Sequence, residues 1–329
     1  MALLALTLAL LPMTVATTAY EVKPLDMAPD SFDDQYRGCG PAMKAALPAL
    51  NHSEFQKNCF FAKGWEKAVA MWQRVGSPVS PLSSSAQAIA IVSYNMIYVH
   101  EEFNDETSVA GRSPQEYRDN FNYKTLHFLL TDALATLRAA QGQQCRCVTW
   151  AAPQYKFKAN VGDIVRLGQF VLSWPCRGGT RSFFTPTMFQ VQTCHGVGIQ
   201  AFIDQPRSET LLIPPFEKFR VTNVIDDGEK EEIHLDSIGT YSKYNCEWLT
   251  GGSVSRAPTI SEDSSWSSQP WQWPQGSSEP QGPEDICGHC YNQDSQRNKS
   301  TRTTMATTAT MAALATMASM WSLRPPLAL

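Results

Sequence analysis

The sequence lacks an excess of positive charge. Its 27 lysines and arginines stand against 31 aspartates and glutamates, which gives a net charge of −4. Proteins that bind nucleic acids or anionic membrane surfaces normally present a basic patch. The composition therefore favours proteins or small molecules as partners.

The chain also lacks a metal-binding spacing and a hydrophobic run long enough to span a membrane. The final stretch, 305–329, is only modestly apolar and is interrupted by Arg324, Pro325 and Pro326. The Cys-Gly-His-Cys motif at 287–290 has no second cluster nearby, which favours a local disulfide or no fixed role over a zinc site. We expect no metal, because the other histidines are scattered: His52, His100, His127, His195 and His234.

Both ends of the chain have the composition of processing segments. Residues 1–19 begin with a short apolar run and end in small residues, which is typical of a secretory signal peptide, although a positive n-region is missing. A buried N-terminal helix is the alternative, and the short run weighs against it. Residues 251–300, rich in Ser, Pro, Gln and Trp, predict a disordered stalk, and 301–329 fits a GPI-attachment signal. We expect a secretory-pathway protein that is extracellular or GPI-anchored at the cell surface.

The remaining residues, 20–250, predict one α+β domain. Apolar spacing suits helices within 42–50, 65–72 and 124–134, and the apolar run 88–94 predicts a buried strand. From 145 to 248, short alternating runs broken by Gly and Pro indicate a sheet. The expected order is helices first and sheet second.

The segment from Pro206 to Phe216 carries the clearest family signal. It resembles the part of vertebrate ecto-ADP-ribosyltransferases in which a Glu-x-Glu pair precedes a Val-Leu-Ile-Pro-Pro strand. Further markers of this resemblance occur in family order from about Leu25 to Trp248: Ser-Phe-Asp-Asp-Gln-Tyr at 31–36, Lys-Thr-Leu-His-Phe at 124–128, Val-Arg-Leu-Gly-Gln-Phe at 165–170, Thr-Cys at 193–194 and Tyr-Asn-Cys-Glu at 244–247. The chain is thus similar to that family over most of its domain.

The resemblance implies a fold and a reaction. The implied fold is an N-terminal helical region followed by a mostly antiparallel β-sandwich core around an NAD cleft. The implied reaction transfers ADP-ribose from NAD, or NADP, to arginine side chains of proteins and releases nicotinamide. In this family an arginine grips the cofactor's phosphates, a serine holds the nicotinamide half, and the second glutamate stabilises the cationic ribose.

Each of these family positions is altered in this chain. The arginine position is Trp150, the serine position is Leu172, and the two glutamate positions are Ser208 and Thr210. Two neighbouring residues are the candidate catalytic replacements: Ser173 and Glu209. Each is one residue out of register, so on a regular strand its side chain faces the opposite side unless a β-bulge re-aims it.

Other residues could keep NAD binding. The segments that border the family's nucleotide cleft contain four candidate cofactor contacts: Tyr94, Arg166, Gln169 and Phe170. Arg146, beside the altered strand, could replace the lost charge. The alternative is that the aromatic residues belong to the core and the two arginines are solvated.

The nine cysteines fit an oxidising compartment. The resemblance implies the disulfides Cys39–Cys246 and Cys145–Cys194. The cysteines at 59, 147, 176, 287 and 290 lie outside that pattern, and their odd number leaves at least one free or intermolecular. Asn51 begins a glycosylation sequon in a family-like position, and a second sequon begins at Asn298.

Three functions remain open on this reading. The first is an arginine-specific mono-ADP-ribosyltransferase of weak or absent activity. The second is a non-catalytic secreted or cell-surface binding protein with an unknown extracellular protein partner. The third is an NAD binder or slow NAD glycohydrolase.

Overall fold

The computed structural model describes residues 20–76, 79–176, 185–203, 209–228 and 230–250. The predicted signal peptide, stalk and GPI signal, the Cys-Gly-His-Cys motif and Ser208 lie outside these ranges. The chain divides into two compact units. Unit 1 takes residues up to Gly38, Asn104–Phe121 and Thr131–Gly252, and unit 2 takes Cys39–Phe103 and Asn122–Leu130.

Unit 2 contains the helices that follow the N-terminal segment: α1 (Gly40–Lys57), α2 (Cys59–Val75) and α3 (Ser85–Tyr94). It also contains the first parts of α4 (Ile97–Ala110) and α6 (Lys124–Ala140), whose later residues belong to unit 1. Helix α2 begins where the Asn58 side chain accepts the Phe61 N–H group, and it ends at Gly76, whose φ of 63° suits glycine. The helices predicted within 42–50, 65–72 and 124–134 are confirmed and extend further.

The strand predicted over 88–94 is wrong, because this run forms helix α3. Every residue from Ala86 to Tyr94 is buried. A helix enclosed on all sides carries no polar stripe, so its short apolar run has the same appearance as a buried strand. Around it, unit 2 contains aromatic contacts such as Phe61 with Trp65 and Phe103 with Tyr123.

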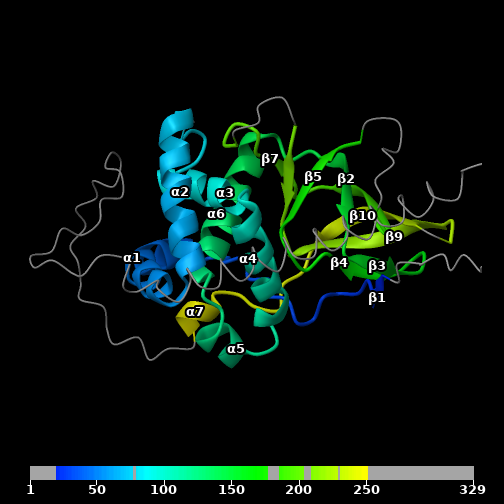
Figure 1. Ribbon diagram of the computed structural model, residues 1–329, viewed down its shortest axis with the longest axis horizontal. Coiled ribbons are helices and arrows are strands. Elements are labelled where there is room, and N and C mark those ends of the chain that lie inside the picture. The colour runs from blue at the N-terminus through cyan, green and yellow to red at the C-terminus, as the bar shows by residue number, and fades with distance from the viewer. Residues whose placement is uncertain (1–19, 77–78, 177–184, 204–208, 229, 251–329) are drawn as a thin grey trace, which may run out of the picture. The chain divides into compact units, whose positions relative to one another are not determined.

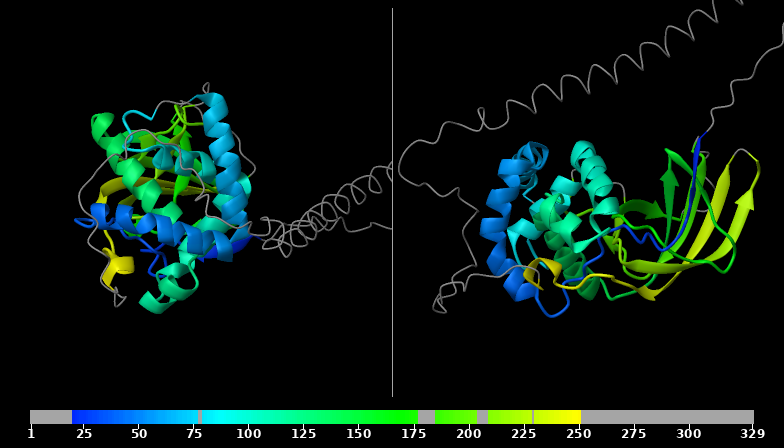
Figure 2. Two further views of the ribbon diagram at one scale, coloured as in Figure 1. Left: turned by 90° about the vertical axis from the view of Figure 1, so that its left-hand side faces the viewer. Right: turned by 90° about the horizontal axis from the view of Figure 1, so that it is seen from below.

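Unit 1 is built on an eight-stranded sheet with the order β4-β9-β10-β6-β2-β5-β8-β7. Its strands are β2 (Arg146–Ala152), β4 (Ile164–Arg166), β5 (Val171–Pro175), β6 (Thr187–Thr193), β7 (Val197–Gly198), β8 (Leu211–Ile213), β9 (Glu217–Asp226) and β10 (Glu231–Thr240). The pairs are antiparallel except for β10 with β6. Figure 2 shows β9 and β10, coloured yellow-green, as a long hairpin.

A separate two-stranded parallel sheet joins β1 (Glu21–Pro24) to β3 (Tyr155–Lys158), which lie side by side in Figure 1. Unit 1 also contains α5 (Pro114–Asp119) and α7 (Glu247–Thr250). Helix α5 starts with a capping signal, in which Ser113 accepts the Glu116 N–H group and Pro114 takes the first helical position. The α+β class and the mostly antiparallel sheet are therefore confirmed.

The core of the large sheet consists of buried aliphatic and aromatic side chains, including Val148, Phe189, Val191, Phe219 and Leu235. These residues alternate along their strands with more exposed ones, as expected for a sheet with one core-facing side. Among the described residues, no helix is sufficiently long and apolar to cross a membrane.

Candidate functional site

The three residues predicted to replace the family's catalytic groups lie on or next to three neighbouring strands. Trp150 lies on β2, Leu172 lies on β5, and Thr210 directly precedes β8; β2, β5 and β8 are adjacent in the sheet. The register pairs Thr149 with Trp174 and Leu172 with Leu212. The structure therefore gathers the altered positions on one part of the sheet.

Trp150 has become a packing residue. It pairs in register with Phe189 on β6, and the two rings stack with centroids 4.8 Å apart and planes 16° from parallel. The indole is partly buried against the sheet core. Its N–H is a single neutral donor, so it cannot neutralise a diphosphate as a guanidinium does.

The geometry contradicts a catalytic role for Ser173. Its side chain is fully buried, and its hydroxyl donates to the carbonyl of Leu211 at 3.2 Å. Leu172, the adjacent residue, is half-buried and points to the other face of β5. The one-residue offset therefore takes the hydroxyl into the core, and a leucine occupies the family's serine position.

Thr210 is buried and supplies no charge. Its exposed fraction is 5%, and its carbonyl accepts the N–H group of Ile199 at 3.0 Å. A threonine hydroxyl cannot provide the negative charge with which a carboxylate stabilises a cationic ribose.

Glu209 and Arg146 lie beside each other. Oε1 of Glu209 is 3.8 Å from Nη1 of Arg146, and the side chains are 48% and 34% exposed. An ion pair this open contributes little to stability. The structure therefore brings together two candidates for the rearranged site, the carboxylate and the replacement cation. Their catalytic and binding roles stay predictions.

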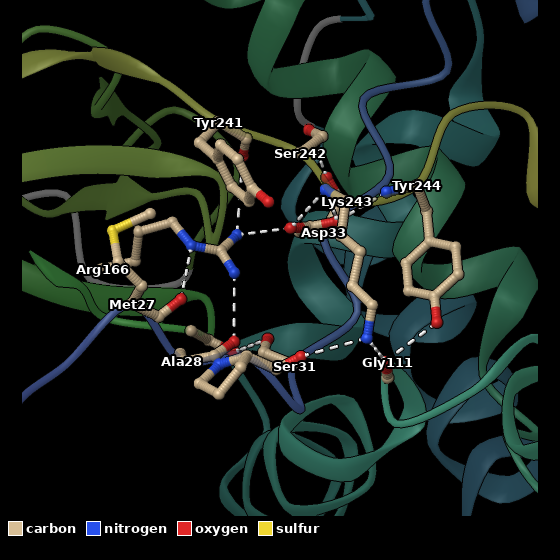
Figure 3. Close-up of polar contacts among 12 residues, drawn as sticks. Met27, Ala28, Ser31, Asp33, Gly111, Arg166, Tyr241, Ser242, Lys243 and Tyr244 are labelled. Atoms are coloured by element: carbon tan, nitrogen blue, oxygen red, sulfur yellow. Dashed lines mark hydrogen bonds and ion pairs between the residues drawn. The ribbon is translucent and has the colours of Figure 1, made fainter.

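Arg166 is a structural residue and not a free nucleotide contact. Its Nε donates to Met27 O at 2.8 Å and its Nη2 to Ala28 O at 3.0 Å, while Nη1 lies 2.6 Å from Oδ2 of Asp33. Figure 3 shows the guanidinium enclosed by these groups beneath the ring of Tyr241. The side chain is 1% exposed, so the expectation of a cofactor contact is contradicted.

Asp33 completes this network. Its carboxylate also accepts the backbone N–H groups of Lys243 and Tyr244, at 2.9 and 3.1 Å (Figure 3). The buried ion pair joins the Ser-Phe-Asp-Asp-Gln-Tyr and Val-Arg-Leu-Gly-Gln-Phe markers, and the N–H group of Tyr244 joins the Tyr-Asn-Cys-Glu marker to the same carboxylate. Their recurrence has a structural reason.

Two other expected cofactor contacts are core residues. Tyr94 is fully buried in unit 2, with its ring 4.9 Å from that of His100. Phe170 is fully buried in unit 1, and its carbonyl accepts Nδ2 of Asn104 at 3.0 Å. Direct nucleotide contact is contradicted for both. Gln169 is half-buried and stays a prediction.

A buried carboxylate that the sequence reading missed is Glu217, at the start of β9. It accepts the hydroxyl of Thr193 at 2.5 Å and the N–H groups of Cys194 and His195 at 2.7 and 3.1 Å. Burial raises the pKa of Glu217 despite these hydrogen bonds. Its signal in the sequence is an acidic residue directly after the Leu-Ile-Pro-Pro-Phe run.

His195 lies on the turn that Glu217 holds. Burial lowers its pKa to about 4, and the positive charges of Arg138 and Arg37 act in the same direction. Nε of Arg138 donates to the carbonyl of Cys194 at 2.8 Å. His195 is therefore neutral at physiological pH.

Two disulfides flank the start of β2. Cys145 is bonded to Cys194, as the resemblance implies, and Cys147 is bonded to Cys176. The cysteines at 39, 59 and 246 are also disulfide-bonded. The pairing of Cys39 with Cys246 stays a prediction.

The comparisons with known proteins agree with this architecture. The family described as NAD:arginine ADP-ribosyltransferase matches residues 25–243. The chain belongs to this family. It is 44% identical over 230 residues to an erythroblast NAD(P)(+)–arginine ADP-ribosyltransferase of Gallus gallus, with 68% of this chain and 76% of that protein covered. It is 41% identical over 238 residues to a GPI-linked NAD(P)(+)–arginine ADP-ribosyltransferase 1 of Mus musculus, covering 69% and 73%.

Solved structures of this family have the same fold. The eukaryotic mono-ADP-ribosyltransferase ART2.2 superposes with a TM-score of 0.57 at 30% identity, covering 68% of this chain and 98% of that one. A mutant of ART2.2 in complex with NAD matches equally well, with a TM-score of 0.57. This ADP-ribosyltransferase-family chain therefore has the fold on which ART2.2 binds NAD.

Proposed function

We propose that ADP-ribose transfer from NAD to protein arginine is weak or absent in this chain, and that the protein acts outside the cell as a non-catalytic binding protein. The observation that carries the proposal is the stacking of Trp150 on Phe189. An aromatic ring is packed where the family grips the cofactor's phosphates. The partner class we propose is an extracellular protein.

Three interactions that would stabilise the transition state of the family reaction are predicted to be lost. Losing one preorganised group that stabilises a transition state costs about 3 kcal/mol, or roughly 10²–10³ in rate. The cation, the hydroxyl and the carboxylate are all missing at their family positions: Trp150, Leu172 and Thr210. Their effects need not add, but the remaining rate is expected to be far below that of an intact site.

Residual use of NAD is the second candidate, and the contact between Arg146 and Glu209 favours it. This pair supplies one cation at the start of β2 and one carboxylate just before β8. An NAD molecule could engage Arg146 through its diphosphate while Glu209 supports slow cleavage to nicotinamide. Gln169 would be a further contact in that site.

The deciding experiment measures transfer and hydrolysis separately. Purified protein is incubated with labelled NAD and an arginine-rich acceptor, and both labelled acceptor and free nicotinamide are quantified. We expect neither above background. Transfer that is lost in Glu209→Ala and kept in Asp236→Ala, an exposed acid on β10, would overturn the proposal. Nicotinamide release without labelled acceptor would support the second candidate.

Calorimetry with NAD then separates a pure binding protein from an NAD binder. Heat of binding that falls in Arg146→Gln would favour the second candidate, whereas no heat at high NAD concentration would exclude it.

We also propose secretion, with a GPI anchor or without one, and a glycan on Asn51. The GPI-linked relative from mouse and the oxidised cysteines support this location. Release from cells by a phosphatidylinositol-specific phospholipase tests the anchor. A mass shift on deglycosylation that is absent in Asn51→Gln tests the glycan.

A further inference from the structure

Unit 1 contains a polar pocket whose lining does not include Trp150, Leu172 or Thr210. It has a volume of about 210 Å³ and is lined by residues of two segments, Gln35, Arg37 and the run Thr240–Asn245. None of the lining residues lies on β2, β5 or β8. Neither Trp150 nor the contact between Arg146 and Glu209 therefore determines what this pocket can bind.

Arg37 is held in place at this pocket. Its backbone N–H donates to Oδ1 of Asn245 at 2.8 Å, and its carbonyl accepts Nδ2 of the same residue at 3.1 Å. Nη2 of its guanidinium donates to Oε1 of Gln35 and to Oγ1 of Thr240, each at 2.8 Å. These contacts orient an exposed guanidinium before any ligand arrives.

Part of that guanidinium is still available. Over the residues that the structure describes, Nε and Nη1 of Arg37 have no acceptor. The described lining contains no aspartate or glutamate, and Tyr241 adds an aromatic side chain that is 46% exposed. Tyr241 carries a hydroxyl that can also donate.

The buried carboxylate of Asp33 is engaged by Arg166 and by backbone N–H groups. Asp33 carries the only charge opposite Arg166 in the network of Figure 3, where it also accepts backbone N–H groups of Lys243 and Tyr244. The Lys243 ammonium is turned to the carbonyl of Gly111 at 2.7 Å. Arg37 is thus the cation that faces the pocket, and its positive field reaches His195.

We propose that this pocket binds an oxyanion, namely a sulfate, phosphate or carboxylate group, through Arg37. The free edge of the guanidinium supplies charge-assisted donors, and the hydroxyl of Tyr241 supplies a neutral one. The volume leaves room for part of the molecule that carries the group. An extracellular ligand with an accessible acidic group fits this site.

The test follows the histidine ¹H NMR signal of His195 in the full-length secreted protein, assigned with His195→Gln. Sodium sulfate, sodium phosphate, sodium acetate and methyl sulfate are titrated against sodium chloride of equal ionic strength. We expect saturable shifts with a dissociation constant on the order of 1 mM, and a rise in the pKa of His195 when the anion neutralises Arg37. Methyl sulfate that binds at least as well as sulfate would identify a carried group as the ligand, and weaker binding would identify a free ion.

Two variants decide the assignment. Arg37→Gln is expected to weaken binding at least tenfold, whereas Arg220→Gln, an exposed cation on β9, leaves binding unchanged. Arg37→Lys keeps the charge and is expected to bind with intermediate affinity. Shifts that are linear in anion concentration, or equal in wild type and Arg37→Gln, would overturn the proposal. Because Arg37 is exposed, thermal unfolding of each variant is expected to match wild type and serves as the folding control.

Discussion

Trp150 and Phe189 face each other on adjacent strands and stack with 4.8 Å between ring centroids. Trp150, the predicted replacement for the family's cation, therefore packs against the sheet core through Phe189. A nucleotide phosphate would have to displace this contact without gaining a charge in return. Because Trp150 is part of the packing of the sheet, its contribution can be measured as a change in the free energy of unfolding.

Replacing Trp150 by alanine is expected to lower the free energy of unfolding by about 2–3 kcal/mol. The loss combines buried area with the aromatic stack, and it is smaller than for a fully buried tryptophan. Urea denaturation followed by circular dichroism measures it. Trp174→Ala is the matched control, because Trp174 is 44% exposed, and we expect less than about 1 kcal/mol there. Equal losses would show that the stack contributes nothing.

Restoring the family residues is expected to restore transfer. A variant with Trp150→Arg, Leu172→Ser, Ser208→Glu and Thr210→Glu returns all four groups, and labelled NAD with an arginine-rich acceptor reports the gain. Each change alone is expected to give little, because the groups act as a unit. A folded fourfold variant that remains inactive would show that other residues limit the reaction.

Removing Arg166 is expected to destabilise unit 1 strongly. Arg166→Met leaves the carboxylate of Asp33 buried without its cation, which typically costs 3–5 kcal/mol. The double variant Arg166→Met with Asp33→Asn is expected to recover part of this loss, since no unpaired charge remains. Chemical denaturation of wild type, Arg166→Met, Asp33→Asn and the double variant gives the coupling energy. A single variant with nearly wild-type stability would contradict the structural role.

Glu54 caps the start of helix α6, and its contribution to the free energy of unfolding is expected to depend on pH. Its carboxylate accepts the N–H groups of Lys124 and Thr125 at 2.5 and 2.9 Å, and burial raises its pKa above 4.5. A raised pKa in the folded state means that this contribution is full below pH 4.5 and is lost as pH rises through the folded value.

Separately from this proton-linked contribution, Glu54→Ala removes the acceptor for two N–H groups and is expected to lose about 1–2 kcal/mol at pH 7, with Glu101→Ala, an exposed acid on α4, near zero. Glu54→Gln keeps an acceptor and removes the titration, so its stability is expected to change less between pH 4 and 7 than that of the wild type. Denaturation curves across this range test both statements, and an unchanged pH slope in Glu54→Gln would contradict the second.

His195 is expected to weaken the fold in acid. Its pKa falls from 6.5 to about 4 on folding, so the unfolded chain takes up the proton first. The stability it contributes is present above pH 6.5 and is lost as pH falls toward 4. His195→Gln should reduce the loss over this interval by roughly 1 kcal/mol, allowing for partial solvent exposure.

The sequence predicted the helices within 42–50, 65–72 and 124–134 better than the site, because three of its four candidate cofactor contacts are buried in the structure. Alternation along a strand was enough to place Ser173 on the wrong face for catalysis, because a one-residue offset inverts every side chain. Helix α3 could not be predicted, because its residues are buried on every side and their pattern has no period.

Arg166 shows a second limit of sequence reading. The sequence alone does not distinguish an arginine that binds a phosphate from one that pairs with a buried carboxylate. The deciding partner, Asp33, lies 133 residues away in the chain. Likewise, the contact between Arg146 and Glu209 depends on how the loop before β8 approaches β2, which no local pattern specifies.

The cysteines on either side of Arg146 anchor strand β2 covalently at its start. One disulfide ties its start to β6 and the other ties it to the end of β5, closing loops of 49 and 29 residues. Each such crosslink typically adds about 3–4 kcal/mol. The position of β2 in the sheet is thereby fixed by covalent bonds and not by the side chain at position 150. A substitution at position 150 can therefore change the chemistry of this surface while the disulfides keep the strand in register.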